Sequence, residues 1–171
     1  MRVYVPVTLS GLAEAYNTGE LGSAPFVAYA VTPALREWYL SDDIEELEYA
    51  ALNRAALASL RLVALDPGAP RRRVVVAVDV PDGAAVADPG LGPDPASLGE
   101  LRVGVDVALA RAAAVHVDSD EAEAEVTAAA EALGAADRGD DDAQFVVDGA
   151  ADHELLWFAT QEIPNLVGLG D

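Results

Sequence analysis

Hydrophobic and polar residues alternate in several short segments, as they do in strands that bury one face. Alternation or a continuous run of β-branched residues predicts strands at residues 1–8, 26–32, 73–80, 101–107 and 112–118. Within 73–80, only Ala77 and Asp79 interrupt a run of valines, which is typical of a central strand covered on both faces. Pro6 lacks the N–H that a central strand donates to its neighbour. We therefore expect the first strand to lie at an edge of the sheet or to end there.

Apolar residues spaced three and four apart predict helices. A short helix follows a capping hydroxyl at Thr8 or Ser10, and Thr32-Pro33 is a second helix start. A long helix runs from about Asp42 to Leu65 and begins with acidic residues, which the helix dipole favours. Its inner face is expected to hold Ile44, Leu47, Ala51, Ala55, Ala58, Leu62 and Leu65. A further helix is predicted from Asp118 or Ser119 to about Leu133.

The remaining segments carry weaker patterns. Residues 81–99 hold four prolines and four glycines without periodicity, which indicates a flexible, exposed loop. Residues 134–142 read as an acidic break between elements. Two short strands are predicted at 144–147 and 154–160, although the second segment also tolerates a helical interpretation, and Pro164 is expected to end it.

Together these elements predict an α+β fold, or loosely an α/β fold, in a single domain over residues 1–171. We expect a single mixed β-sheet of five to six strands with the long helix packed on one face, and a ferredoxin-like arrangement is the first hypothesis. The pattern Arg-Val-x-Val-x-Val-x-Leu occurs at 2–9 and again at 102–109. A duplicated half could produce it, but valine alternation is common in strands of this composition, and we favour coincidence.

Composition and charge exclude several classes of function. The chain has no cysteine, which excludes disulfides, thiolate metal sites and cysteine nucleophiles. No apolar run approaches the roughly 20 residues that cross a bilayer. The formal net charge is −20, and all ten basic residues are arginine. Such a charge repels phosphate backbones and anionic lipids, so we expect no nucleic-acid and no membrane partner. It either keeps the protein soluble, the interpretation we favour, or attracts a basic protein partner.

No motif for a known chemistry is present in the sequence. It lacks a Walker loop, the glycine fingerprint of dinucleotide binding, a serine nucleophile elbow, a zinc-protease helix and an EF-hand loop. The first ten residues alternate like a strand and carry no signal-peptide pattern. We therefore predict a cytoplasmic protein without a cofactor, and we favour a non-enzymatic role over an enzymatic one.

Two histidines offer the remaining candidates for catalysis. His116 and Asp118 could form an acid–base pair at a strand end, but a strand-end histidine beside a helix cap is the more common arrangement. His153 and Glu154, with Asp148 and Asp152 nearby, could bind a divalent cation. The spacing matches no known metal loop, so we favour a solvated acidic turn and predict no metal.

Aromatic residues gather in one segment and at one later position. The segment from residue 32 to 49 contains Arg36, Trp38 and Tyr39, and Trp157 lies near the other end of the chain. Tryptophan, tyrosine and arginine anchor many protein interfaces, so these four residues are the candidate interaction surface. The alternative, which we favour for the two tryptophans, is burial in the core. Arg71-Arg72-Arg73 is expected to pair with neighbouring carboxylates rather than to bind a phosphate.

The chain also resembles a known group of proteins. The segments that carry the resemblance are AVTPALREWY, EELEYAALNRAALASLRL, RRRVVVAVDV, AAVHVD and DAQFVVDGAADHELLWFATQEIPNL. They resemble a family of short, uncharacterised actinobacterial proteins of unknown function. The resemblance implies a single-domain cytoplasmic protein from a GC-rich actinobacterium, and it carries no activity or site residues.

Three hypotheses for the function follow. The first is a non-catalytic protein that acts through contact with a protein partner or with a second copy of itself. The second is a small-molecule binding module with a pocket between the long helix and the sheet. The third is a hydrolase or lyase that uses His116 and Asp118 or His153 and Glu154.

Overall fold

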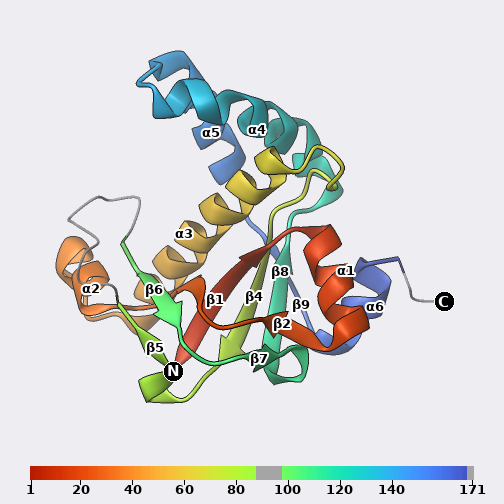
Figure 1. The fold of residues 1–171 in the computed structure, drawn as a ribbon. Helices are drawn as coiled ribbons and strands as arrows, with labels where there is room; N and C mark the ends of the chain where they lie inside the picture. Colours follow the sequence, from red (N-terminus) through yellow and green to blue (C-terminus); the bar gives the residue numbers. More distant parts are fainter. Residues whose placement is uncertain (88–97, 169–171) are drawn as a thin grey trace.

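A computed structural model describes residues 1–87 and 98–168 (Figure 1). Its strands are β1 (Arg2–Val7), β2 (Glu20–Gly22), β3 (Phe26–Tyr29), β4 (Val74–Asp79), β5 (Ala85–Val86), β6 (Glu100–Val103), β7 (Val107–Ala108), β8 (Ala112–Val117) and β9 (Leu156–Phe158). Its α-helices are α1 (Leu9–Thr18), α2 (Pro33–Tyr39), α3 (Ile44–Leu65), α4 (Glu123–Asp137), α5 (Asp141–Ala151) and α6 (Ile163–Leu166).

Seven strands form the main sheet in the order β5-β6-β3-β1-β4-β8-β9. Each recorded pairing between neighbours is antiparallel, so the sheet is not mixed as the sequence suggested. The predicted α+β class is confirmed, and the sheet has one or two strands more than expected. The strand prediction for 154–160 is confirmed by β9. The sequence did not reveal β5 in this sheet or β2 in the two-stranded ribbon.

The first strand lies in the middle of the sheet, between β3 and β4. The prediction of an edge position was therefore wrong. β4 pairs with all of β1, whereas pairing with β3 is recorded only between Tyr4 and Tyr29. Because that pairing does not reach Pro6, the proline leaves no ladder hydrogen bond unmade on the β3 side.

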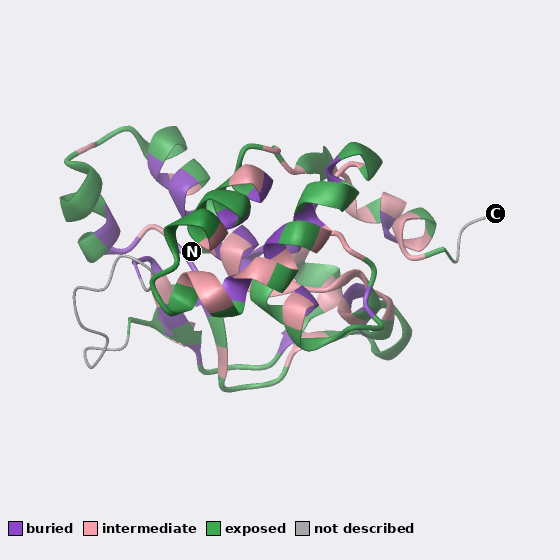
Figure 2. Cartoon of the chain, turned by 90° about the horizontal axis from the view of Figure 1, so that it is seen from above, coloured by how far each residue is buried: buried purple, intermediate pink, exposed green. Residues whose placement is uncertain are grey.

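Helices cover both faces of the sheet. On one face, α3 packs its small residues against Tyr4, Val75 and Ala77. On the other, α1 and α6 cover the ends of β4 and β8, and the two-stranded β2–β7 ribbon covers β3 and β6. Figure 2 shows the resulting buried residues as a central layer between exposed helix surfaces. The valines of β4 are fully buried because both faces of that strand are covered, as the sequence predicted.

The long helix confirms its predicted length but not all of its inner face. It starts after Asp43, whose carboxylate accepts hydrogen bonds from two backbone N–H groups of the first turn. Ile44, Leu62 and Leu65 are exposed, contrary to prediction. The side chains that α3 buries are Leu47, Ala50, Ala51, Ala55, Ala56, Ser59, Leu60 and Val63. The buried stripe drifts around the helix because 3.6 residues per turn do not match a fixed repeat of seven.

A helical hairpin formed by α4 and α5 rises beyond one end of the sheet (Figure 1). It packs against the C-terminal half of α3 through Leu60, Val126, Leu133 and Val147. The predicted strand at 144–147 is wrong, because these residues lie within α5. Asp140, in the expected acidic break, accepts a hydrogen bond from Ala143 and caps this helix.

The ferredoxin-like arrangement is present only in part. β3 and β4 flank β1 and are joined by α2 and α3, which forms one split βαβ unit. In the described residues no second unit of this kind interlocks with it, and helices lie on both faces of the sheet. The repeat at 102–109 is divided between β6 and β7 and leads into β8, so it is not a second copy of β1 and α1.

The segment predicted as a flexible loop, 81–99, is only partly described. Residues 82–84 form a 3₁₀ turn and β5 follows it. Residues 88–97 of this prediction lie outside the described part of the chain. Within residues 1–87 and 98–168, no helix combines the length and the apolar character needed to span a bilayer.

Candidate functional site

The corner between α2 and α3 exposes a group of large apolar side chains. Trp38 is 55% exposed, Leu40 is 91% exposed, and Tyr39 and Ile44 are also exposed. Thr32 caps α2 and Pro33 occupies its first turn, as predicted, which fixes where the short helix begins. These four residues, 38, 39, 40 and 44, are called the α2 corner below.

The predicted interaction surface is divided between two parts of the molecule. Arg36, Trp38 and Tyr39 lie together on α2, but Trp157 lies on the edge strand β9, on the opposite side of α3 (Figure 1). Trp157 is 62% exposed, so neither tryptophan belongs to the core. The favoured interpretation of both as core residues was wrong, because small residues of α3, chiefly alanine, fill the space above the sheet.

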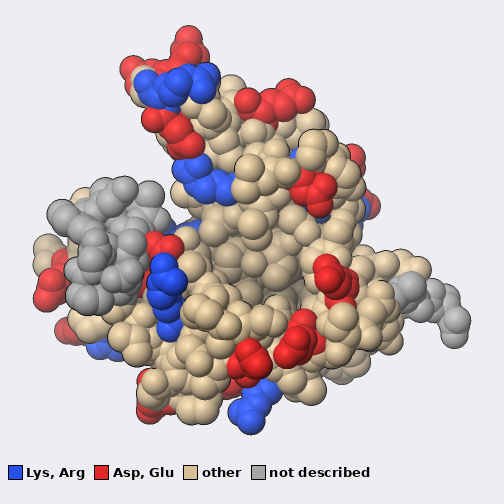
Figure 3. Space-filling model, in the orientation of Figure 1, with Lys and Arg blue, Asp and Glu red and all other residues tan. Residues whose placement is uncertain are grey.

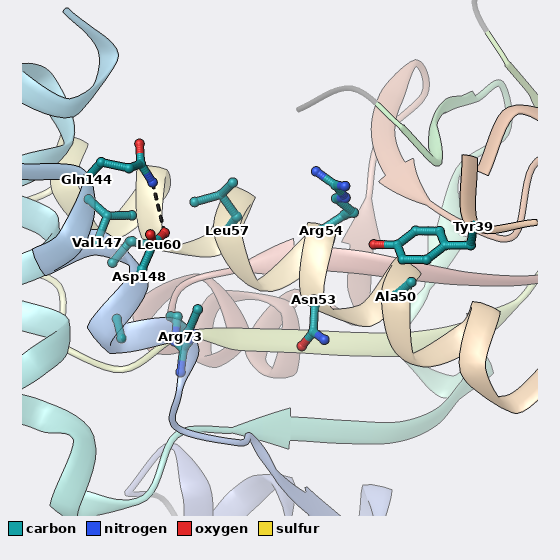
Figure 4. Close-up of a pocket in the computed structure, with 12 residues that line it drawn as sticks. Tyr39, Ala50, Asn53, Arg54, Leu57, Leu60, Arg73, Gln144, Val147 and Asp148 are labelled. Atoms are coloured by element: carbon teal, nitrogen blue, oxygen red, sulfur yellow. Dashed lines mark hydrogen bonds between the residues drawn. The ribbon is translucent and has the colours of Figure 1, made fainter. Parts of the chain in front are cut away.

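A pocket of about 220 Å³ lies on the outward side of α3, between that helix, α2 and α5. Leu57, Leu60 and Val147 supply apolar walls, and Tyr39 closes one end (Figure 4). The sequence predicted a pocket between the long helix and the sheet. This pocket is lined mainly by α3 and α5, and Arg73, beside the start of β4, also borders it.

Positively and negatively charged side chains both line this pocket. Arg54 of α3 makes no hydrogen bond or ion pair with any described residue. Asp148 of α5 accepts a hydrogen bond of 2.9 Å from the side-chain amide of Gln144, which fixes the carboxylate on the opposite wall. Figure 4 shows Leu57 between Arg54 and Asp148, and the hydroxyl of Tyr39 directed toward α3. The sequence indicated Asp148 only as a neighbour of the possible cation site at His153 and Glu154, and it did not indicate Arg54, because only the α3–α5 contact brings the two residues to one pocket.

The floor of the pocket contains a buried ion pair. Arg73, at the start of β4, donates to both carboxylate oxygens of Asp118 through Nε and an Nη at 2.8 and 2.7 Å. Its backbone N–H also donates to Asp118, and an Nη donates to the carbonyl oxygen of His153. Arg72 pairs with Asp120. The expected pairing of the arginine run with carboxylates is thus confirmed for two residues, whereas Arg71 donates to the backbone carbonyls of Val63 and Pro67.

The His116–Asp118 pair does not form. Asp118 is fully occupied by Arg73, while His116 lies on β8 opposite Trp157 and Val75 and is partly buried. Burial of the imidazole lowers the pKa of His116 below 6.5, and the nearby positive charge of Arg2 lowers it further. His116 is therefore a partly buried packing residue of β8, and it does not pair with Asp118.

This shift predicts a pH dependence of stability. Since the pKa of His116 is lower in the folded than in the unfolded chain, the unfolded chain binds the proton first as the pH falls. The free energy of unfolding should decrease as the pH falls below about 6.5 and level off below the folded-state pKa. Urea unfolding at a series of pH values should show this slope. It should disappear in His116→Gln and persist in His153→Gln, and an unchanged slope in His116→Gln would contradict the assignment.

The second candidate cluster is also dispersed. Nε2 of His153 lies 3.7 Å from a carboxylate oxygen of Glu125, and Glu154 accepts a hydrogen bond from the hydroxyl of Tyr49. Asp148 is turned into the pocket instead. In the part of the chain that the structure describes, no three ligating side chains converge on a point that could hold a metal ion.

Comparisons with known proteins give the family of the chain. No curated protein and no solved structure matches the chain. One family model, described as a family of unknown function (DUF6912), matches residues 1–167 and so covers nearly the whole chain. The chain belongs to the family of unknown function DUF6912.

Proposed function

We propose that this is a cytoplasmic, non-catalytic protein that binds a basic protein partner through the α2 corner and does not bind nucleic acid. The observation that carries the proposal is the exposure of Trp38 and Leu40, which lie two residues apart at the end of α2. Tryptophan is among the residues that contribute most to binding when an interface covers it.

The backbone at Leu40 supports a role in binding rather than in folding. Leu40 ends α2 in the left-handed conformation, with φ 49°, where glycine or asparagine is preferred. A leucine at this position strains the backbone while its side chain remains almost entirely in solvent. Neither property favours the stability of the folded chain, and both are accounted for if a partner covers the leucine.

Charge around the α2 corner selects the class of partner. Five exposed acidic residues lie within or beside it, namely Glu37, Asp42, Asp43, Glu45 and Glu46. Only Arg36 is basic in this segment. With a net charge of −20, the molecule attracts a basic surface over a long range and repels a second copy of itself. Figure 3 shows acidic side chains at several places on one face of the molecule, with arginine side chains among them.

The test begins with a photo-crosslinking amino acid at Glu37 in cells, with the same group at Phe145, an exposed aromatic position on α5, as the control. The protein captured only from position 37 is identified, purified and titrated by calorimetry. We expect it to carry a basic surface, to bind more weakly as salt concentration rises, and to lose at least about 30-fold in affinity with Trp38→Ala. Phe145→Ala should leave binding unchanged.

Leu40→Asn provides a second variant in which binding and stability change in opposite directions. Asparagine tolerates the left-handed backbone, so the free energy of unfolding should rise by about 0.5–1 kcal/mol. Affinity for the partner should fall because the apolar contact is lost. A self-crosslink at position 37, or equal capture from positions 37 and 145, would contradict the proposal, and the first outcome would indicate a homodimer.

A further inference from the structure

We infer that the pocket between α3 and α5 binds a small zwitterionic amino compound, whose carboxylate contacts Arg54 and whose ammonium group contacts Asp148. This site is separate from the α2 corner, although Tyr39 borders both. The inference goes beyond the proposed protein contact and does not depend on it.

Arg54 provides the anchor for the anionic end. The protein has thirty acidic residues and only ten basic ones, and Arg54 forms no ion pair with a carboxylate of the described residues, as is also true of Arg36, Arg71, Arg111 and Arg138. Arg2, Arg61, Arg72 and Arg73 all form ion pairs. Arg54 instead borders the pocket and pairs with none of the residues that the structure describes, so its guanidinium can offer several donors to a carboxylate.

Asp148, on the facing wall, provides the negative charge that would bind the ammonium group of the ligand. The amide of Gln144, one helical turn earlier on α5, donates to one of its oxygens and leaves the other oxygen available. Asp148 and Arg54 do not pair with each other, and the side chain of Leu57 lies between them (Figure 4). A purely anionic ligand would be repelled by Asp148, whereas a ligand with both charges and an apolar body satisfies all three side chains.

The size of the pocket limits the ligand to a small molecule. Pockets that bury drug-sized ligands measure roughly 300–1,000 Å³, and this pocket measures about 220 Å³. The apolar walls formed by Leu57, Leu60 and Val147 favour an aliphatic body between the two charged ends. An aliphatic amino acid with separated charges therefore fits the chemistry better than a nucleotide or a sugar phosphate.

The experiment uses three probes that share one aliphatic chain. ε-Aminocaproate carries both charges, caproate lacks the ammonium group, and hexylamine lacks the carboxylate. Binding to the full chain is followed by NMR shifts of the backbone amides of Asn53 and Gly149, with γ-aminobutyrate as a shorter probe. We expect a zwitterion to bind at least about tenfold more tightly than caproate and hexylamine.

Substitutions assign each end of the ligand. Arg54→Gln should remove the advantage of ε-aminocaproate over hexylamine, and Asp148→Asn should remove its advantage over caproate. Arg111→Gln and Asp142→Asn make the same charge changes at exposed positions outside the pocket and should have no effect. The inference is overturned if neither zwitterion shifts these amides, if caproate binds as tightly as ε-aminocaproate, or if all four variants behave alike.

Discussion

Asp118→Ala is expected to lower the free energy of unfolding by about 3–5 kcal/mol, the typical cost of removing one partner from a buried ion pair. Asp118 is 2% exposed and accepts three hydrogen bonds from Arg73, one from the backbone and two from the guanidinium. Without the carboxylate, a buried positive charge and a buried N–H lose their partner together. Since Arg73 also holds the carbonyl of His153, the connection from α5 to β9 should loosen as well.

Urea denaturation of the purified chain measures this loss, and the exposed Arg2–Asp79 pair provides the matched control. Asp79→Ala removes an aspartate from an Arg–Asp pair of similar geometry at the other end of β4, but both side chains of that pair are exposed. Its cost should be within about 1 kcal/mol. The double variant Arg73→Met with Asp118→Leu should recover most of the stability that Asp118→Ala loses. If Asp118→Ala and Asp79→Ala cost the same, the buried pair is not the stabilising contact described.

The sequence predicted the elements whose pattern is local. β4, β8 and α3 each follow from a run or a spacing within one segment, and the burial of β4 on both faces follows from its valines. The central position of β1 could not be predicted, because it depends on which strands the chain later brings to its two sides. Pro6 argued for an edge, and only the restricted pairing with β3 explains how a central strand accommodates it.

The predicted type of secondary structure was wrong where tertiary contacts outweighed the local preference of the residues. The segment 144–147, Gln-Phe-Val-Val, has strand-forming residues, yet it forms part of α5 because Val147 and Ala150 pack onto α4 and α3. The signal that was available is Asp140, followed by further aspartates, which is a typical helix N-terminus. Its interpretation as a break between elements concealed the α4–α5 hairpin, and with it the pocket.

Site residues were predictable only where neighbours in sequence remain neighbours in space. Arg36, Trp38 and Tyr39 share one short helix, so their grouping was visible in the sequence. Arg54 and Asp148 are separated by more than half of the chain and carry no motif, so nothing in the sequence could bring them together. Conversely, His116 and Asp118 are close in sequence, but Arg73 takes the carboxylate because β4 and β8 pair along their length.

Ser59→Ala is expected to cost about 2–4 kcal/mol of folding free energy, although it removes a single oxygen atom. The hydroxyl of Ser59 is fully buried in α3 and donates to the carbonyl of Val7 at 2.6 Å, while it accepts from the N–H of Val74 at 2.8 Å. It thus bridges the end of β1 and the start of β4, and alanine would leave a buried donor and a buried acceptor unpaired. Urea denaturation measures the loss, and Thr127→Ala is the control, because that hydroxyl donates to a carbonyl within α4 near solvent. Its removal should change stability by less than about 0.5 kcal/mol. Equal effects of the two substitutions would show that water replaces the Ser59 hydroxyl, and that the helix does not hold the two strands through this bridge.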